Sequence, residues 1–231
     1  MEETMREIIF DTETTGFDPK SGDRMVEIGC IEMLNRVPTG RTFHAYFNPE
    51  RAMPAEAEAV HGLSDAFLAD KPLFAHLAED FLAFIADSPM VAHNAGFDFA
   101  FINAELALCG FPAVARDRMV DTVAMAKVRH PGAKLSLDAL CTRYGIDRSH
   151  RTKHGALLDA ELLAQVYVEL CGGRQIGLAL VAETTEIVTE IKVLGRKDRI
   201  HRQPRPHAAT VAELAAHAEF LRSVDSPLWV S

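Results

Sequence analysis

Alternating apolar and polar residues in the first part of the chain predict β-strands. The pattern occurs at residues 25–34 and 41–47, and a short apolar run at residues 7–10 predicts a buried strand before them. Short segments rich in glycine, proline and aspartate separate these runs. Strands joined by such segments predict an antiparallel meander.

Farther along the chain, apolar residues recur every three or four positions, which is the spacing of helices with one buried face. The expected helices cover residues 55–60, 73–85, 97–108, 135–144 and 155–170. Short strands are expected at 89–92 and from residue 120, where the chain turns helical before 128. Strands followed by helices that alternate with short strands predict an α/β fold, with a mixed sheet flanked by helices.

The composition changes after Gly173. Residues 182–209 include a strongly basic stretch with two prolines, and we interpret them as a linker. Thr210 and Glu213 then match a capping box, which predicts a further helix. Trp229, the only tryptophan, is interpreted as an anchor for a partner. The predicted organisation is a main domain at 1–181, a basic linker at 182–209 and a docking segment at 210–231.

The overall composition limits the class of protein. The chain has 231 residues, of which 48% are hydrophobic and 25% charged, as in a soluble domain with a tail. Its formal net charge of −9 argues against non-specific DNA binding through a basic face. A nucleic-acid substrate would therefore need metal ions to neutralise its phosphates, or a partner to hold it.

The cysteines and the start of the chain predict a cytosolic protein. Cys30, Cys109, Cys141 and Cys171 form no CxxC pair, which argues against a zinc ribbon and against a disulfide framework. Reduced, buried cysteines are expected instead. The charged residues 1–6 argue against a signal peptide, and no apolar run reaches the roughly 20 residues of a membrane span.

Two acidic residues after the first apolar run are the first chemical signal. Asp11 and Glu13 are two positions apart, so they share one face of an extended chain. Neighbouring carboxylates repel each other, and a bound divalent cation removes that conflict. Oxygen ligands of this kind suit Mg²⁺ and Mn²⁺. The alternative is a solvated strand end that caps the next turn.

Asp98, His154 and Asp159 extend this candidate site. Asp98 starts a predicted helix, where the helix dipole by itself also favours an acid. Asp159 lies on the last predicted helix of the main domain, and His154 directly precedes that helix. An imidazole can take a proton from an attacking water, although a surface histidine is the plain alternative. The remaining candidates are interpreted as caps, turns, solvated or structural residues: Asp121, Asp138, Asp147 and His93.

Three segments resemble the motifs of the DEDDh 3′–5′ exonuclease family, which has a ribonuclease H-like fold. They are residues 11–16 (DTETTG), 93–98 (HNAGFD) and 151–160 (RTKHGALLDA). Their order and separation resemble those of the family over residues 5–173. The last segment is similar to the histidine version of the third motif, rather than to the tyrosine version.

The resemblance implies roles for most of the residues that the chemistry singles out. Two divalent cations, Mg²⁺ or Mn²⁺, would bind to four carboxylates: Asp11, Glu13, Asp98 and Asp159. His154 would act as the general base. The terminal nucleotide would lie against some of the same carboxylates and the turn after them: Asp11, Glu13, Asp159, Thr14, Thr15 and Gly16.

Other segments are similar to the proofreading exonucleases of bacterial replicative DNA polymerases, a group within this family. Residues 56–62 (EAEAVHG) resemble a segment that contacts the terminal nucleotide, which implies that Glu56 and His61 bind substrate. The basic linker and the end with Trp229 resemble a polymerase-binding tail. The resemblance implies a bacterial, cytoplasmic enzyme that releases mismatched 3′-terminal nucleotides as deoxynucleoside monophosphates.

Two other functions stay open at this point. A free-standing DEDDh exonuclease that trims RNA or single-stranded DNA would have the same site, but little need for a linker and a tryptophan anchor. An inactive adaptor would keep the fold for binding alone, and the complete acidic set argues against it.

Residues 175–180 (QIGLAL) resemble the short peptide that bacterial replication proteins insert into the sliding clamp. The contact would be made by Gln175, Leu178 and Leu180. The alternative is that this segment is the apolar start of the linker and packs on the main domain.

Overall fold

The computed structural model of the protein describes residues 5–151, 153–173 and 208–223. Residues 5–173 hold a sheet with helices around it, and residues 208–223 hold one further helix, which is considered by itself. The expected boundary at residue 181 lies outside the described residues and stays a prediction. None of the described helices is long and apolar enough to cross a membrane.

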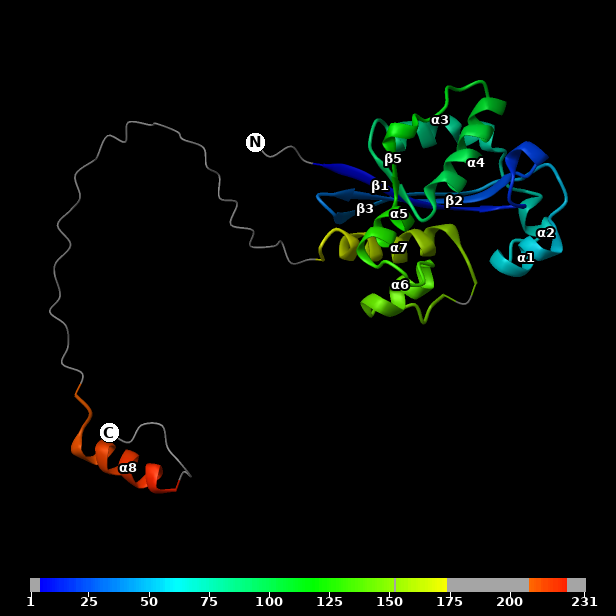
Figure 1. Cartoon of the computed structure of the whole chain (residues 1–231). Helices are drawn as coiled ribbons and strands as arrows, with labels where there is room; N and C mark the ends of the chain where they lie inside the picture. Colours follow the sequence, from blue (N-terminus) through cyan, green and yellow to red (C-terminus); the bar gives the residue numbers. More distant parts are fainter. Residues whose placement is uncertain (1–4, 152, 174–207, 224–231) are drawn as a thin grey trace, which may run out of the picture. The chain divides into compact units, whose positions relative to one another are not determined.

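The described strands form one five-stranded sheet in the order β3-β2-β1-β4-β5 (Figure 1). β1 and β3 each pair with β2 in antiparallel fashion, β4 is parallel to β1, and β5 is parallel to β4. The predicted meander and the mixed sheet are therefore confirmed. The bounds are Arg6–Thr14 for β1, Met25–Leu34 for β2, Val37–Tyr46 for β3, Met90–Ala92 for β4 and Met119–Asp121 for β5.

The helices agree with the apolar spacing, with one addition. The bounds are Ala55–His61 for α1, Asp65–Leu68 for α2, Phe74–Ile85 for α3, Ala95–Leu108 for α4, Thr122–Arg129 for α5, Leu137–Tyr144 for α6 and Ala156–Leu170 for α7, with single 3-10 turns at Pro19–Ser21 and Arg116–Arg118. The sequence did not predict α2, which is capped by the Ser64 hydroxyl and is too short to show a periodic pattern.

β3 begins at Val37 rather than at residue 41. Asn35 and Arg36 have φ angles of 50° and 66°, and they form a tight turn between the two strands. Such a turn matches the twist of a hairpin, so pairing resumes at once between Leu34 and Val37. All four cysteines are free; Cys30 and Cys141 are buried as expected, whereas Cys109 and Cys171 are only partly buried.

Side chains alternate along β1 between two apolar layers. Ile8 and Phe10 pack in a cluster with α3 and α4, whereas Ile9 packs in a cluster with α7. Figure 1 shows α3 and α4 on one side of the sheet, and α5, α6 and α7 on the other. Continued alternation places Asp11 and Glu13 on the α7 side and Thr12 on the α4 side.

A glycine in β2 lets α7 lie unusually close to the sheet. Gly29 pairs with Asp11 across the β1–β2 ladder. A Cβ atom at Gly29 would lie 2.3 Å from the Leu157 backbone nitrogen and 2.5 Å from the Ala156 carbonyl carbon. A glycine inside a strand typically marks such a close backbone approach. This contact fixes the distance between β1 and α7, the helix that carries Asp159.

The separate helix α8 covers Val211–Arg222 and starts as predicted. The Thr210 hydroxyl accepts from the Glu213 amide, and the Glu213 carboxylate accepts from the Thr210 amide, which completes the capping box. Its apolar residues Leu214 and Phe220 are exposed.

The close approach at Gly29 generates a stability prediction. We expect Gly29→Ala to lower the free energy of unfolding by about 1–3 kcal/mol, because the added methyl group meets backbone atoms that have no room to move aside. Urea unfolding followed by circular dichroism measures this. Gly96→Ala is the control, since a Cβ there meets nothing within 4 Å and alanine suits a helix. Equal stability of Gly29→Ala and wild type would contradict the role given to Gly29.

Candidate metal centre and active site

The first two acids of the site come from β1. Asp11 is half-buried and Glu13 is buried, and both continue the face of β1 that α7 covers. Glu13 lies directly opposite Glu27 in the β1–β2 ladder. Two buried carboxylates on facing positions repel each other strongly, so this end of the sheet concentrates negative charge.

The third acid, Asp98, is held from the opposite side of β1. It lies in the first turn of α4 and is buried. The Thr12 hydroxyl donates a hydrogen bond to its Oδ1 atom over 2.7 Å. β1 therefore supplies two carboxylates from one face and, from the other face, the hydroxyl that holds a third.

The loop before α4 contains contacts that explain Asp121 and His93. Asp121 caps α5 through the Val123 amide at 2.9 Å and also accepts from the Asn94 amide at 3.1 Å. His93 shares a hydrogen bond of 2.9 Å with the Thr122 hydroxyl. Both side chains stabilise the end of the sheet near Asp98, in agreement with the structural roles predicted for them from the sequence.

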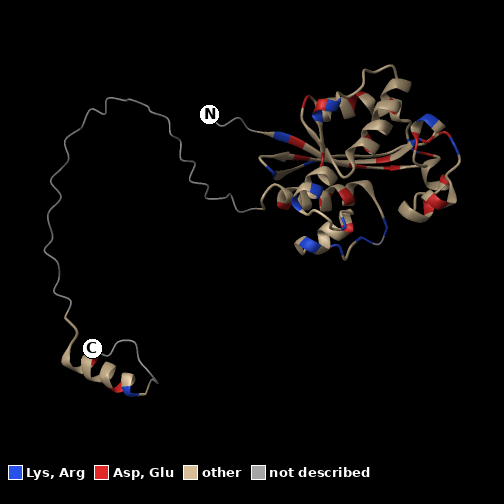
Figure 2. Cartoon of the chain, viewed as in Figure 1, with Lys and Arg blue, Asp and Glu red and all other residues tan. Residues whose placement is uncertain are grey.

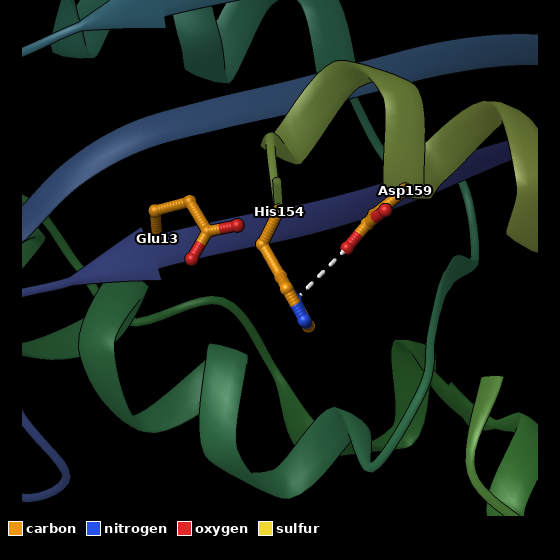
Figure 3. A group of neighbouring side chains, drawn as sticks. All are labelled: Glu13, His154 and Asp159. Carbon is orange, nitrogen blue, oxygen red and sulfur yellow. Dashed lines mark ion pairs between the residues drawn. The ribbon is translucent and has the colours of Figure 1, made fainter. Parts of the chain in front are cut away.

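The fourth acid and the histidine come from α7 and the residue preceding its N-cap. Asp159 is buried in the first turn of α7, and His154 is exposed. Figure 3 shows the two side chains beside Glu13, with the His154 Nδ1 atom 3.3 Å from Asp159 Oδ2. One nitrogen or oxygen atom from each of the three residues lies within 4.8 Å of the others. Glu13, which is far from the other two in sequence, therefore forms one cluster with His154 and Asp159.

Arg151 also belongs to this cluster, and the sequence assigned it no role. Its Nε and Nη2 atoms donate to the two carboxylate oxygens of Asp159, over 2.5 and 2.6 Å. Its Nη1 atom donates to Asp138 over 2.8 Å. Asp138 pairs with Arg148 as well, so it is a partner of the site's arginine rather than a purely solvated residue.

The electrostatics follow from burial and crowding. Burial, reinforced by the charges of Asp98, Glu13 and Asp159, raises the pKa of Asp11 well above its usual value. Burial and the charge of Glu27 raise the pKa of Glu13 to about 8. Burial raises the pKa of Asp98 to about 7, against the opposing hydrogen bond from Thr12. Near neutral pH, Glu13 and Asp98 can therefore hold a proton or exchange it for a cation.

The donor set fits a divalent cation. The Glu13 Oε1 atom is buried and has no hydrogen-bond partner among the described residues. An unpartnered buried oxygen is costly, and a cation relieves that cost. Carboxylate oxygens of this kind are suitable ligands for Mg²⁺ or Mn²⁺.

The turn after β1 is shaped by its own hydroxyls. Thr14 donates to the Gly16 carbonyl over 2.6 Å, and the Thr15 hydroxyl accepts from the Arg24 amide over 3.0 Å. A Cβ at Gly16 would lie 2.2 Å from a carboxylate oxygen of Asp23. A larger residue at Gly16 would thus require Asp23 to move aside, and the turn holds its backbone beside the carboxylates.

The two residues of α1 that are expected to bind substrate, His61 and Glu56, have different surroundings in the structure. His61 is buried, its Nδ1 accepts from the Leu63 amide over 3.0 Å, and burial lowers its pKa although the Thr14 backbone opposes this. Its position next to Thr14 brings it to the end of β1. Glu56 is exposed, and among the described residues no hydrogen bond or ion pair links it to the acids. Its substrate role stays a prediction.

The expected partner contacts lie outside the described residues: Gln175, Leu178, Leu180 and Trp229. Three further residues matter that sequence reasoning assigned no role, namely Thr12, Gly29 and Arg151. A glycine inside an apolar strand was the available signal for Gly29. The partner of Thr12 lies 86 residues away along the chain, and the two partners of Arg151 lie 8 and 13 residues away. No local sequence pattern predicts these contacts.

Comparison with known proteins shows the family of the chain. The chain matches the family described as Exonuclease over residues 8–167. It is 49% identical over 227 residues to the DNA polymerase III subunit epsilon of Rickettsia felis, covering 96% of this chain and 97% of that protein. The DNA polymerase III subunit epsilon of Escherichia coli is 42% identical, with 92% and 90% covered.

Solved structures show the same fold. Exonuclease X, in complex with 5′ overhanging duplex DNA, has a TM-score of 0.53 and 25% identity, covering 72% of this chain and 90% of that one. The nuclease domain of 3′hExo, a DEDDh family member bound to rAMP, has a TM-score of 0.63 and 14% identity, with 74% and 93% covered. The predicted family resemblance is confirmed. The chain belongs to the exonuclease family, in the group of the DNA polymerase III epsilon subunits.

Proposed function

We propose that this exonuclease removes mismatched 3′-terminal nucleotides from DNA as deoxynucleoside monophosphates, as the proofreading subunit of a bacterial replicative polymerase in the cytoplasm. The observation that carries the proposal is the meeting of Glu13, His154 and Asp159 within 4.8 Å, next to a half-buried Asp11. The near full-length similarity to epsilon subunits supports the polymerase context.

The exonuclease family uses divalent metal ions, and we assign two of them, Mg²⁺ or Mn²⁺, to this site. The carboxylates that would hold them are Asp11, Glu13, Asp98 and Asp159. When bound, the ions would activate water and stabilise the leaving 3′ oxygen. The raised pKa values of Glu13 and Asp98 support the assignment, because a cation takes the place of the protons that these groups otherwise hold.

His154 is the proposed general base. Its side chain is exposed beside two buried carboxylates, so it can approach both the solvent and a substrate phosphate. Its amide donates to the Val60 carbonyl of α1 over 3.3 Å, which ties the loop to the helix that carries His61. The turn at Thr14, Thr15 and Gly16 would support the terminal nucleotide.

A free-standing exonuclease that trims RNA or single-stranded DNA is the alternative function. The helix α8 argues against it. A capping box fixes its start, yet Leu214 and Phe220 are exposed, as expected of a segment that docks on another protein. We therefore assign polymerase docking to residues 210–231, including Trp229. The resemblance of residues 175–180 to the clamp-binding peptide is the basis on which we assign clamp binding to Gln175, Leu178 and Leu180.

The metal assignment predicts how stability depends on pH. Glu13 and Asp98 have folded-state pKa values of about 8 and 7, above their ordinary values, so they stabilise the fold while protonated. In the presence of a chelator, the free energy of unfolding should therefore fall as the pH rises from about 4, where these groups ionise in the unfolded chain, to about 8, where both have ionised in the folded chain as well. Saturating Mg²⁺ should reduce this fall, because the ionised carboxylates are then paired.

Urea unfolding at several pH values, with chelator and with Mg²⁺, measures the effect. Glu13→Gln is the control, since it removes the titrating group and should flatten the curve in chelator. Parallel curves with and without Mg²⁺ would count against the metal assignment.

The active-site assignment predicts large losses of rate. We expect Asp11→Asn to lower Mg²⁺-dependent release of nucleoside monophosphates about a thousandfold, because bound ions supply several kcal/mol of transition-state stabilisation. His154→Ala should lower the rate by about 100-fold to 10,000-fold, the usual worth of a general base. DNA binding should persist in His154→Ala.

End-labelled single-stranded DNA and RNA, each with Mg²⁺ and with chelator, provide the assay. Glu161→Gln is the matched control, since Glu161 is exposed on the same helix as Asp159 and makes no side-chain contact in the cluster. An Asp11→Asn enzyme with wild-type turnover would refute the metal site. Faster hydrolysis of RNA than of DNA would favour the trimming function.

The role assigned to the tail predicts that exonuclease activity can be separated from assembly with the polymerase. A chain that ends at residue 181 should degrade oligonucleotides as well as the full chain, but it should no longer co-purify with the polymerase catalytic subunit. In the full chain, Leu214→Ser should weaken that co-purification, whereas Glu219→Gln, an exposed change on α8, should not.

The same series tests the clamp segment. Gln175→Ala combined with Leu178→Ala should abolish binding to the sliding clamp and leave the polymerase contact intact. Co-purification of the truncated chain with the polymerase would refute the docking assignment, and clamp binding by the double variant would refute the clamp assignment.

A further inference from the structure

We infer that Arg151 is a built-in counter-ion that competes with a divalent cation for Asp159, and that it shifts toward Asp138 when the cation binds. The inference rests on the proposed metal site. It makes Arg151 a positioning residue that acts through Asp159 and His154, not a catalytic residue.

The geometry of the pair carries the first step. Arg151 Nε donates to Asp159 Oδ1 and Arg151 Nη2 donates to Asp159 Oδ2, so the guanidinium takes up both carboxylate oxygens. Two-point pairing of this kind is among the strongest polar contacts in proteins and also fixes the orientation of both groups. A cation that uses an oxygen of Asp159 must therefore share or displace this arginine.

The charge of Arg151 acts on the rest of the site as well. The side chain is only 9% exposed, and its charge lowers the pKa of Asp11 and of Glu13 against the effect of burial. It thus partly offsets the repulsion among the acids, as a metal ion would. An arginine and a divalent cation in the same place repel each other, so the two are alternatives rather than companions.

Asp138 gives the displaced guanidinium a second partner. Arg151 Nη1 already donates to Asp138 Oδ1 over 2.8 Å, and the Asp138 side chain is 46% exposed on α6. A cavity of about 400 Å³ lies there, lined by Asp138, Cys141, Arg148 and Arg151 among others. Figure 2 shows that the connection between α6 and α7 carries basic residues, in contrast to the acids on the neighbouring strands. Arg151 can therefore leave Asp159 without losing all of its contacts.

The exchange would also act on the proposed base. Arg151 Nη2 lies 2.9 Å from His154 Nδ1, and an arginine can only donate, so Nδ1 accepts in this arrangement. Withdrawal of Arg151 toward Asp138 frees that nitrogen. Cation binding at Asp159 and release of His154 would then occur in one step, and the base would be free only in a loaded site.

The test is isothermal titration of the full chain with Mn²⁺ alone. Arg151→Gln keeps most of the side chain but removes its charge and its two-point pairing with Asp159. This variant should bind Mn²⁺ at least about tenfold more tightly, a difference of about 1.4 kcal/mol in binding free energy. Arg151→Lys, which keeps the charge but loses two-point pairing, should fall between Arg151→Gln and wild type. Arg143→Gln is the matched control, because Arg143 is exposed on α6 and, among the described residues, no hydrogen bond or ion pair joins it to Asp138 or Asp159. Its Mn²⁺ affinity should equal that of wild type.

A crystal structure with Mn²⁺ gives the second readout, with Arg151 expected on Asp138 and no longer on Asp159. Equal or weaker Mn²⁺ binding by Arg151→Gln, or an arginine still paired with Asp159 in the Mn²⁺ complex, would overturn the inference. Those results would leave the proposed metal site intact. A wild-type chain that binds no Mn²⁺, or an Asp11→Asn variant that binds it as well as wild type, would overturn the metal site itself.

Discussion

Mutual repulsion among carboxylates gathered in one buried place is the constraint on which the site depends. Asp11, Glu13, Asp98 and Asp159 lie close enough for their charges to act on one another, and burial removes the water that would screen them. Such a cluster persists only if protons, hydrogen bonds or cations offset the repulsion. The fold supplies the Thr12 hydroxyl and the Arg151 guanidinium, and divalent cations are the proposed remainder. The same conflict that strains the fold is the physical reason for the proposed metal site.

The fold places a single strand, β1, at the centre of this site. β1 presents acids on one face and a threonine on the other, and helices α7 and α4 bring one acid each to those two faces. Gly29 is essential to this arrangement because its missing side chain lets the start of α7 lie directly on β2, opposite Asp11. The chemistry of an exonuclease thus depends on a packing detail in a strand that carries none of the four acids.

Local sequence patterns indicate much of the site, for definite physical reasons. The alternation of a strand puts Asp11 and Glu13 on one face, and the order of the acidic segments resembles a family whose fold is known. The prediction did not extend to Asp138 as a partner of Arg151, nor to Thr12 as a partner of Asp98. Polar side chains of this kind have no periodic pattern, so their partners depend on how distant elements pack. Helix α2 was missed because a single turn carries no periodicity, and β3 started early because two residues adopted positive φ angles.

The sequence by itself determined the meander, the described helices except α2, and the family, because these follow from local periodicity and from short motifs. It also nominated the residues proposed to carry the chemistry. Only the tertiary structure decided which atoms meet: Glu13, His154 and Asp159 within 4.8 Å, and Arg151 between two aspartates. The raised pKa values of Glu13 and Asp98 belong to that second group as well. Charges interact through space and through burial, and neither quantity exists until the helices have packed on the sheet.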